Sequence, residues 1–185
     1  PNVAVFTDDP FGAVGSLEAA AASYNTISNA AGTRYFLVGG SPADTLLTVD
    51  SGLNIVTRFD LGVAATAARL TPDGRRLLVT ADTLRIFDTT AGDLTEIVPS
   101  TRPNVGLSPI DVAVSLDSKV AWVLSSSSRK LTAVDLTTYK VLGSLTIPGL
   151  STGVTAAPGG SLWVTAQNRV YEVDGTAMTM RGDIA

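Results

Sequence analysis

Aspartates are the most regularly placed chemical groups in this chain. Four strand-like apolar runs each end in Val-Asp or Phe-Asp, at Asp50, Asp88, Asp135 and Asp174. Four such carboxylates could form a ring that holds a metal or another ligand. An aspartate at a strand end can also accept backbone N–H bonds from the turn that follows it. Because repeated units usually reuse a residue for one structural task, we predict the turn-stabilising role for all four.

The absence of two residue types narrows the chemistry further. The chain has no cysteine and no histidine, which excludes zinc on Cys or His, haem on His, thiol nucleophiles and any Ser-His-Asp triad. A metal-dependent hydrolase would need carboxylates and an asparagine around a divalent cation. Near the expected inner strands only Asn25, Asn29 and Asp111 are candidates. We therefore expect no catalytic residue, no metal and no cofactor.

The aspartates belong to a repeat that must position them. A turn precedes each one, at Gly32, Gly74, Ser118 and Gly160, and these positions are 42, 44 and 42 residues apart. Short runs of Val, Leu, Ile and Thr between Gly, Pro, Asp and Ser indicate strands. A period of about 40 to 50 residues holding four short strands is typical of a propeller blade. The pattern predicts an all-β propeller of about four four-stranded blades.

We expect one domain over residues 1–185. Residues 1–23 form an N-terminal strand and loop, and the blades lie at about 24–62, 63–104, 105–149 and 150–185. The apolar segment Val3–Phe6 is predicted to supply a strand to a neighbouring blade. Residues 16–22 are either one or two helical turns, since Ser16 can cap an alanine run, or a loop, which Gly12 and Gly15 would suit.

The second repeat carries a resemblance to a known family. It consists of Leu70-Thr71-Pro72-Asp73-Gly74-Arg75-Arg76-Leu77-Leu78-Val79-Thr80 and then Leu84-Arg85-Ile86-Phe87-Asp88. These residues resemble the YVTN-type β-propeller repeat, with its Ser-Pro-Asp-Gly turn, Leu-Tyr-Val-Thr strand and Ile-Asp strand end. The resemblance covers about residues 24–185, more loosely in the other repeats. It implies a surface, scaffold or binding module with no shared catalytic residues.

Propellers of that family usually close with more blades than this chain holds. A small closed four-bladed ring, a part of a larger propeller and a half-ring that pairs with another copy are the alternatives. The chain ends at Ala185, inside the expected outer strand of the last blade, which favours a partial propeller in the form of an open arc. Because an arc would expose apolar blade faces, we expect self-association.

Charge and hydropathy exclude two classes of partner. The net charge is −4 and the 13 basic residues form no stripe, so nucleic-acid binding is not expected. No apolar run reaches the roughly 18 residues of a membrane span. A protein or carbohydrate partner remains. The resemblance, the cysteine-free composition and the start at Pro1, which indicates a cleaved leader or upstream domain, together predict an exported bacterial protein, periplasmic or at the cell surface.

Ligands of propellers bind where the loops between the second and third strands meet the inter-blade connections. Polar residues of these loops are the predicted ligand-binding set: Asp44, Asp82, Arg102, Asn104, Arg129, Lys130, Asn168 and Arg169. Trp122 and Trp163 occupy equivalent places, which favours packing between blades over a stacking platform for sugar. The predicted function is a non-catalytic binding or scaffold module. The alternatives are a lactonase-like metal-dependent propeller hydrolase and a purely structural surface-layer repeat.

Overall fold

The computed structural model describes residues 2–8, 11–18, 23–39, 44–91, 94–100 and 102–185, with side chains from Asn25 onward. Four antiparallel sheets of four strands each follow one another along the chain. Blade 1 is β3 (Ser23–Ser28), β4 (Arg34–Gly39), β5 (Thr45–Asp50) and β6 (Ile55–Asp60). Blade 2 is β7 (Ala67–Leu70), β8 (Arg76–Thr80), β9 (Leu84–Asp88) and β10 (Thr95–Ile97). Blade 3 is β11 (Pro109–Val114), β12 (Val120–Ser125), β13 (Lys130–Asp135) and β14 (Val141–Thr146). Blade 4 is β15 (Ser151–Ala156), β16 (Ser161–Ala166), β17 (Arg169–Asp174) and β18 (Thr179–Ile184).

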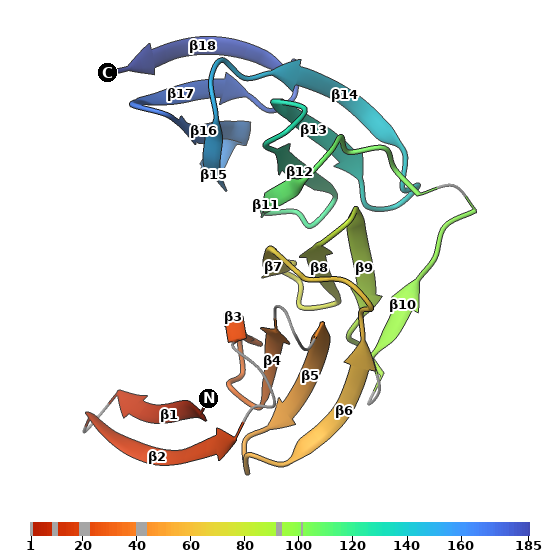
Figure 1. Ribbon diagram of the computed structural model, residues 1–185, viewed down its shortest axis with the longest axis vertical. Helices are drawn as coiled ribbons and strands as arrows, with labels where there is room; N and C mark the ends of the chain where they lie inside the picture. The colour runs from red at the N-terminus through yellow and green to blue at the C-terminus, as the bar shows by residue number, and fades with distance from the viewer. Residues whose placement is uncertain (1, 9–10, 19–22, 40–43, 92–93, 101) are drawn as a thin grey trace.

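The four blades stand side by side in an open arc (Figure 1). Their first strands β3, β7, β11 and β15 line the concave side, and their last strands β6, β10, β14 and β18 lie on the convex side. This arrangement confirms the predicted all-β partial propeller of four blades. No helix in the described part of the chain is long and apolar enough to cross a membrane.

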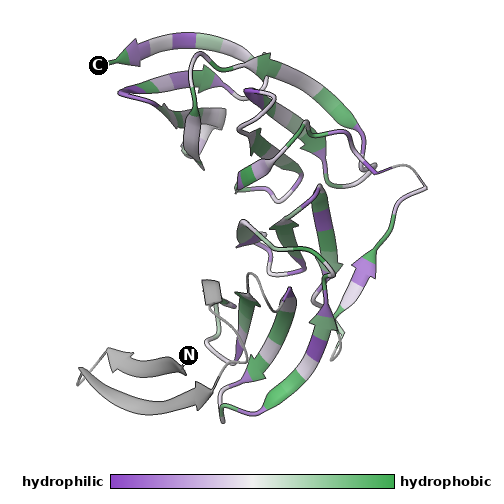
Figure 2. Ribbon diagram, in the orientation of Figure 1, coloured by the Kyte–Doolittle hydropathy of each residue, from purple (hydrophilic) through white to green (hydrophobic). Residues whose placement is uncertain are grey.

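Burial between blades explains why the middle strands are continuous apolar runs. In β12, Ala121 and Val123 belong to the core shared with blade 2, whereas Trp122 and Leu124 belong to the core shared with blade 4. Successive residues of a strand point to opposite faces of the sheet. A strand that is covered on both faces therefore needs apolar residues at every position, and hydrophobic residues accordingly run along β8 and β12 in Figure 2.

Tight turns join the first and second strands of each blade. The predicted turn residues Gly32, Gly74, Ser118 and Gly160 all have positive φ, at 65°, 71°, 61° and 83°. Ser118 takes this conformation although it has a side chain, and it is buried. Its hydroxyl oxygen accepts a hydrogen bond from the backbone N–H of Asp73 at 3.0 Å. The third turn therefore links blade 3 to blade 2.

The four repeated aspartates stabilise the turns that follow them, as predicted. The Oδ1 atom of Asp135 accepts N–H bonds from Thr137 and Thr138 at 2.6 and 2.8 Å, and these two bonds hold the pKa of Asp135 below its ordinary value. Asp50, Asp88 and Asp174 accept equivalent backbone bonds two residues further on. Each aspartate therefore serves its own blade, and the four do not form a ligand ring.

The N-terminal segment differs from the prediction. Val3–Phe6 lies in β1 (Asn2–Asp8), which pairs with β2 (Phe11–Glu18) in a separate two-stranded sheet. Residues 16–18 belong to β2 and are neither helix nor loop, because they pair with residues 2–4. Residues 19–22 of the predicted helix or loop lie outside the described residues.

Substitution of Gly74 by alanine tests the turn conformation. A Cβ atom at Gly74 or at Gly182 would meet nothing within 4 Å, but only Gly74 has positive φ. We expect Gly74→Ala to lower the free energy of unfolding by about 1 kcal/mol through backbone strain. Gly182→Ala, in strand β18, should leave it unchanged or raise it by about 0.5 kcal/mol. Urea titrations of both variants measure this, and equal effects would contradict the assigned turn.

The pH dependence of stability tests the turn aspartates. A carboxyl group whose pKa is lowered by folding stabilises the protein above its ordinary pKa of 3.8, and this stabilisation is lost as the pH falls through the folded pKa. Asp135→Asn keeps an acceptor oxygen but cannot be protonated. We expect the free energy of unfolding to fall less steeply below about pH 4 in this variant than in the wild type. Asp82→Asn, in the exposed turn between β8 and β9, is the matched control. A slope unchanged by Asp135→Asn would refute the assignment.

Candidate interaction face of the fourth blade

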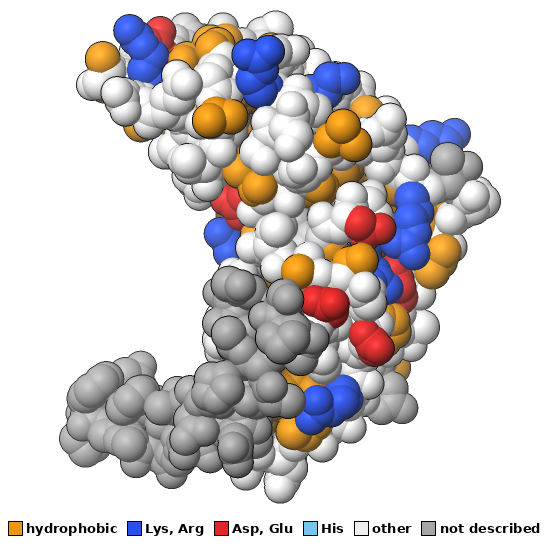
Figure 3. All heavy atoms as spheres, in the orientation of Figure 1, with side chains coloured by type: hydrophobic (Ala, Val, Ile, Leu, Met, Phe, Trp, Pro, Cys, Tyr) orange, Lys and Arg blue, Asp and Glu red, His pale blue; other side chains and the backbone are white. Residues whose placement is uncertain are grey.

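The predicted ligand-binding residues share one rim but do not converge. Asp82, Arg129, Lys130, Asn168 and Arg169 lie in or beside the equivalent β8–β9, β12–β13 and β16–β17 turns of successive blades. The repeat therefore spaces them along the arc, and Figure 3 shows the Lys and Arg side chains of this view spread in the same way. The exposed turn residues come from different blades, and among the described residues no side-chain hydrogen bond or ion pair joins any two of the predicted set.

Three of the predicted residues are already engaged within their own blade or loop. Arg102 forms an ion pair with Glu96 at 3.1 Å, and Arg169 forms one with Asp183. The Oδ1 atom of Asn104 accepts the N–H bond of Gly106 at 3.1 Å. The remaining residue, Asp44, directly precedes β5, and its Oδ1 is buried with no hydrogen-bond partner among the described residues. The contacts of Arg102, Asn104 and Arg169 are thus structural ones within the described residues.

The candidate metal ligands are likewise occupied by structural bonds. The Oδ1 of Asn29 accepts the N–H groups of Thr33 and Arg34 at 2.9 and 3.1 Å. Asp111 accepts the N–H of Val154 in blade 4 at 2.9 Å and lies 3.6 Å from Arg69 in blade 2. Among the described residues, no group of three or more acidic side chains could hold a metal ion.

Directional contacts between blades are made by a few polar side chains. Between blades 2 and 3, the Thr66 hydroxyl donates to the carbonyl of Pro109 at 2.7 Å and contacts the Thr80 hydroxyl at 2.8 Å. Between blades 3 and 4, the Trp122 indole Nε1–H donates to the carbonyl of Gly175 at 3.0 Å. Each donor projects from one blade to the backbone of the next blade along the chain.

Side-chain packing supplements these bonds at the interface of blades 3 and 4. Gly143 lies beneath Met178, because a Cβ atom on Gly143 would stand 3.2 Å from the Met178 Cγ. Trp122 is 4% exposed, and its ring would lie 2.9 Å from a Cβ on Gly175. Two glycines, one in each blade, therefore make room for large side chains of the opposite blade.

Blade 4 repeats the same groups on its outer side. In blade 3, Trp122 pairs with Ala133, which pairs with Gly143 on its other side. In blade 4, Trp163 pairs with Glu172, which pairs with Gly182 in the same way. The Thr152 and Thr165 hydroxyls lie 2.9 Å apart, and those of Thr66 and Thr80 lie 2.8 Å apart. We call this surface the blade 4 face; its residues are Thr152, Ser161, Trp163, Thr165, Glu172, Arg181 and Gly182.

The Trp163 indole on the blade 4 face has no neighbouring blade to reach among the described residues, whereas the Thr152 and Thr165 hydroxyls bond within the blade. Trp163 is partly exposed, and no described residue accepts a hydrogen bond from its indole N–H. A Cβ atom on Gly182 would meet nothing within 4 Å. Blade 4 therefore carries counterparts of the Trp122 indole and of Gly143, with which blade 3 contacts blade 4, but no described residue contacts them in that way.

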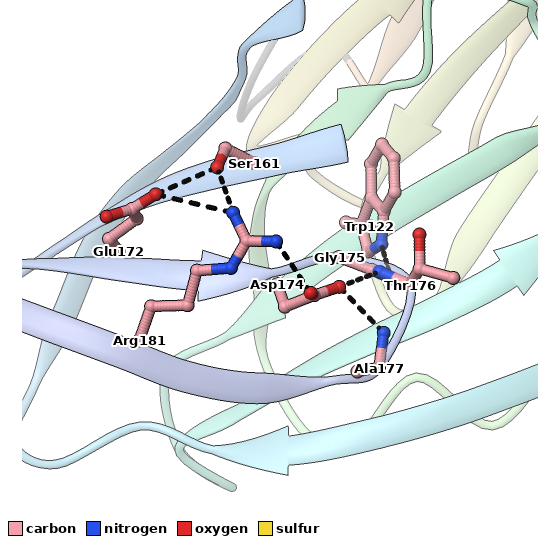
Figure 4. Close-up of polar contacts among 8 residues, drawn as sticks. All are labelled: Trp122, Ser161, Glu172, Asp174, Gly175, Thr176, Ala177 and Arg181. Atoms are coloured by element: carbon pink, nitrogen blue, oxygen red, sulfur yellow. Dashed lines mark hydrogen bonds and ion pairs between the residues drawn. The ribbon is translucent and has the colours of Figure 1, made fainter. Parts of the chain in front are cut away.

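An ionic network crosses the edge of this face (Figure 4). Arg181 donates to Asp174 Oδ2 at 2.7 Å and to Ser161 Oγ at 2.9 Å, and its guanidinium lies 3.5 Å from Glu172 Oε1. The N–H bond from Ala177 is the main cause that lowers the pKa of Asp174, and Arg181 lowers it further. The network holds Arg181 in place as a fixed cation at the edge of the blade 4 face.

The residues of this network were missed by reasoning from the sequence. Ser161 and Glu172 occupy the register positions that Val120 and Ala133 occupy in blade 3. An alignment of the repeats would have found polar residues where the preceding blade has apolar ones. The packing predicted for the equivalent tryptophans holds for Trp122, which is buried, whereas Trp163 is partly exposed.

Comparison with known proteins supports the fold. No protein-family model matches the chain, and no curated protein matches it. Among solved structures, a hydrazine synthase chain from Kuenenia stuttgartiensis is similar, with a TM-score of 0.75 and 19% sequence identity over 87% of this chain. The matched region covers 48% of that chain, so this chain spans about half of its length. At this identity the similarity shows a shared fold.

A pair of phenylalanine substitutions tests the different states of the two indoles. Trp122→Phe leaves the Gly175 carbonyl without its donor inside a buried interface, so we expect a loss of about 1 to 3 kcal/mol in the free energy of unfolding. Trp163→Phe removes an N–H group that has no acceptor, so the change should stay within about 0.5 kcal/mol. Urea titration at a protein concentration below about 1 µM, where the single chain predominates, measures both values. Losses of equal size would contradict the different states assigned to the two indoles.

Proposed function

We propose that this chain is a non-catalytic binding or scaffold module that associates with a further blade-like β-sheet through the blade 4 face. One observation carries the proposal: Trp163 on this face is the counterpart of the Trp122 donor, and no described residue accepts its indole N–H. A donor excluded from water without an acceptor costs about 1 to 3 kcal/mol. A partner sheet that presents a backbone carbonyl, as blade 4 does to Trp122, would satisfy this donor.

The chemistry of the face favours a protein partner over a carbohydrate. A sugar could stack on Trp163, but the open position at Gly182 and the Thr152–Thr165 hydroxyl pair match contacts that this chain makes with protein. A second copy of the chain carries blades of the required type, so self-association is the form that we propose. Such an interface typically buries about 1,200 to 2,000 Å².

The non-catalytic assignment is part of the same proposal. The candidate ligands of a lactonase-like metal centre, Asn29 and Asp111, are bound to backbone N–H groups and to Arg69. A purely structural surface-layer repeat would not need an unpartnered indole donor at one end, which favours a module with a partner. An exported bacterial location remains part of the proposal, supported by the resemblance of the repeats and the cysteine-free composition.

Analytical ultracentrifugation tests association through this face. We expect the wild-type 19.0 kDa chain to associate reversibly at protein concentrations of about 1 to 100 µM, the affinity range of weak interfaces. Trp163→Arg, which places a second cation beside Arg181, should raise the dissociation constant at least about ten-fold. Leu142→Arg, on the exposed outer strand β14, is the control because Leu142 is 58% exposed and lies off the face. A wild-type chain that stays monomeric throughout would refute the proposed self-association.

A further inference from the structure

The N-terminal hairpin has the strand register of the outer half of a blade. In β1–β2, Asn2 pairs with Glu18, Val5 with Gly15 and Phe6 with Ala13. In β13–β14 of blade 3, Lys130 pairs with Thr146, Ala133 with Gly143 and Val134 with Val141. Each pair in the first set corresponds to a pair in the second at a constant offset along the chain. The hairpin thus repeats the pairing of the third and fourth strands of a blade.

A β-bulge at the same place strengthens this equivalence. The register of β1–β2 shifts between Val5 and Phe6, and that of β13–β14 shifts between Ala133 and Val134. Blades 1 and 4 have their bulge at the corresponding step, in β5–β6 and β17–β18. The sequences agree as well, since Gly15-Ser16-Leu17 corresponds to Gly143-Ser144-Leu145. Bulges are recurrent features of related strand pairs, so chance is a poor explanation for the match.

The hairpin also occupies the place of a blade. It lies beyond blade 1, on the side away from blade 2 (Figure 1). On that side of blade 1, Leu37, Leu47 and Val49 are buried, with exposures of 3%, 5% and 1%. Blade 1 is therefore covered on the side where a preceding blade would stand, although no four-stranded sheet is present there among the described residues.

In the part of the chain that the structure describes, one edge of β1 has no neighbouring strand. In each complete blade the third strand pairs on both sides, as β13 does with β12 and β14. The two-stranded sheet β1–β2 contains no counterpart of β12, so β1 has a free edge where the third strand of a blade is normally internal. A free edge presents unpaired N–H and C=O groups and is a template for an added strand.

We propose that β1–β2 is the outer half of an additional blade and that the free edge of β1 binds a partner β-hairpin that supplies the inner two strands. The fitting partner is an antiparallel hairpin of the type of β11–β12, with apolar residues on both faces of its second strand and backbone groups that pair with β1. This inference rests on strand register and does not depend on the proposed function of the blade 4 face.

A fused hairpin tests the inference in the full chain. Residues 109–129 of blade 3 end directly before Lys130, whose equivalent is Asn2. A second copy of these residues placed immediately before Asn2 should complete the blade in the blade 3 register. We expect amide hydrogen exchange in residues 2–8 to slow at least about ten-fold, which signals a paired central strand. The control deletes one residue from the copied turn. This deletion shifts the register of the added strand by one residue and so moves its side chains to the opposite face of the sheet.

Disulfide trapping tests the register directly, because the natural chain contains no cysteine. In blade 3, Trp122 pairs with Ala133, the equivalent of Val5. Val5→Cys should therefore form a disulfide with a cysteine at the Trp122 position of the added hairpin, but not with one at the Ala121 position, which points to the opposite face. A synthetic peptide of residues 109–125 offers the same test without fusion.

The outcomes separate this inference from the proposed function. Slower exchange in residues 2–8 together with the Val5 disulfide supports the completed blade, and both should also be found in a Trp163→Arg background. Unchanged exchange in residues 2–8 in both the fusion and the peptide mixture would overturn it. The inference would also be overturned if exchange in residues 2–8 of the unmodified chain became slower as the protein concentration increased. That result would show pairing between the β1 edges of two copies.

Discussion

Burial of both sheet faces is the constraint on which this structure depends. A four-stranded blade with apolar residues on each side cannot cover itself, so each blade is stable only beside another. The cores of Phe36, Val38 and Phe87 between blades 1 and 2, and of Trp122, Leu124 and Leu162 between blades 3 and 4, are the direct result. The alternation of β12 between two such cores makes blade 3 a part of two interfaces. In an open arc, the outer faces of the first and last blades therefore also need to be covered.

The two ends meet this requirement differently. At the N-terminal end, the half-blade β1–β2 lies beyond blade 1, and the side chains Leu37, Leu47 and Val49 are buried. At the C-terminal end, a serine and a glutamate replace apolar residues, and Arg181 joins them in an ionic network. That replacement lowers the unfavourable free energy of exposing this face to water. Trp163 and Gly182 nevertheless remain at the positions that Trp122 and Gly143 use for packing in blade 3. Within the described residues, a strand edge is thus unpaired at one end, and the Trp163 indole N–H is unpartnered at the other.

Local patterns in the sequence were sufficient to predict the blades. The repeat period, the Asp73-Gly74 turn and the strand-ending aspartates act within a few residues of one another, and the structure confirms their roles. Contacts between repeats were not visible in this way. The backbone N–H of Asp73 donates to the Ser118 hydroxyl, and Arg102 forms an ion pair with Glu96. Only the packing of the folded chain brings these residues together. The segment 16–18 was misjudged because an alanine-rich composition outweighed a strand register that only a comparison with Gly143-Ser144-Leu145 makes apparent.

Polar donors between blades add something that apolar burial lacks. The hydrophobic effect is non-directional, so an apolar face alone would accept many sheets in many registers. The Trp122 indole and the Thr66 hydroxyl each reach one carbonyl of the next blade. A displaced blade would leave such a donor buried and unpaired, which costs more than the bond contributes when it is made. These few bonds therefore act mainly to reject wrong neighbours. The same logic applies to the blade 4 face, where an incoming sheet must satisfy Trp163 without displacing Arg181 from Asp174. In the association that we propose, the end of the arc would select its partner by where that partner places its backbone carbonyls, and apolar area would supply the affinity.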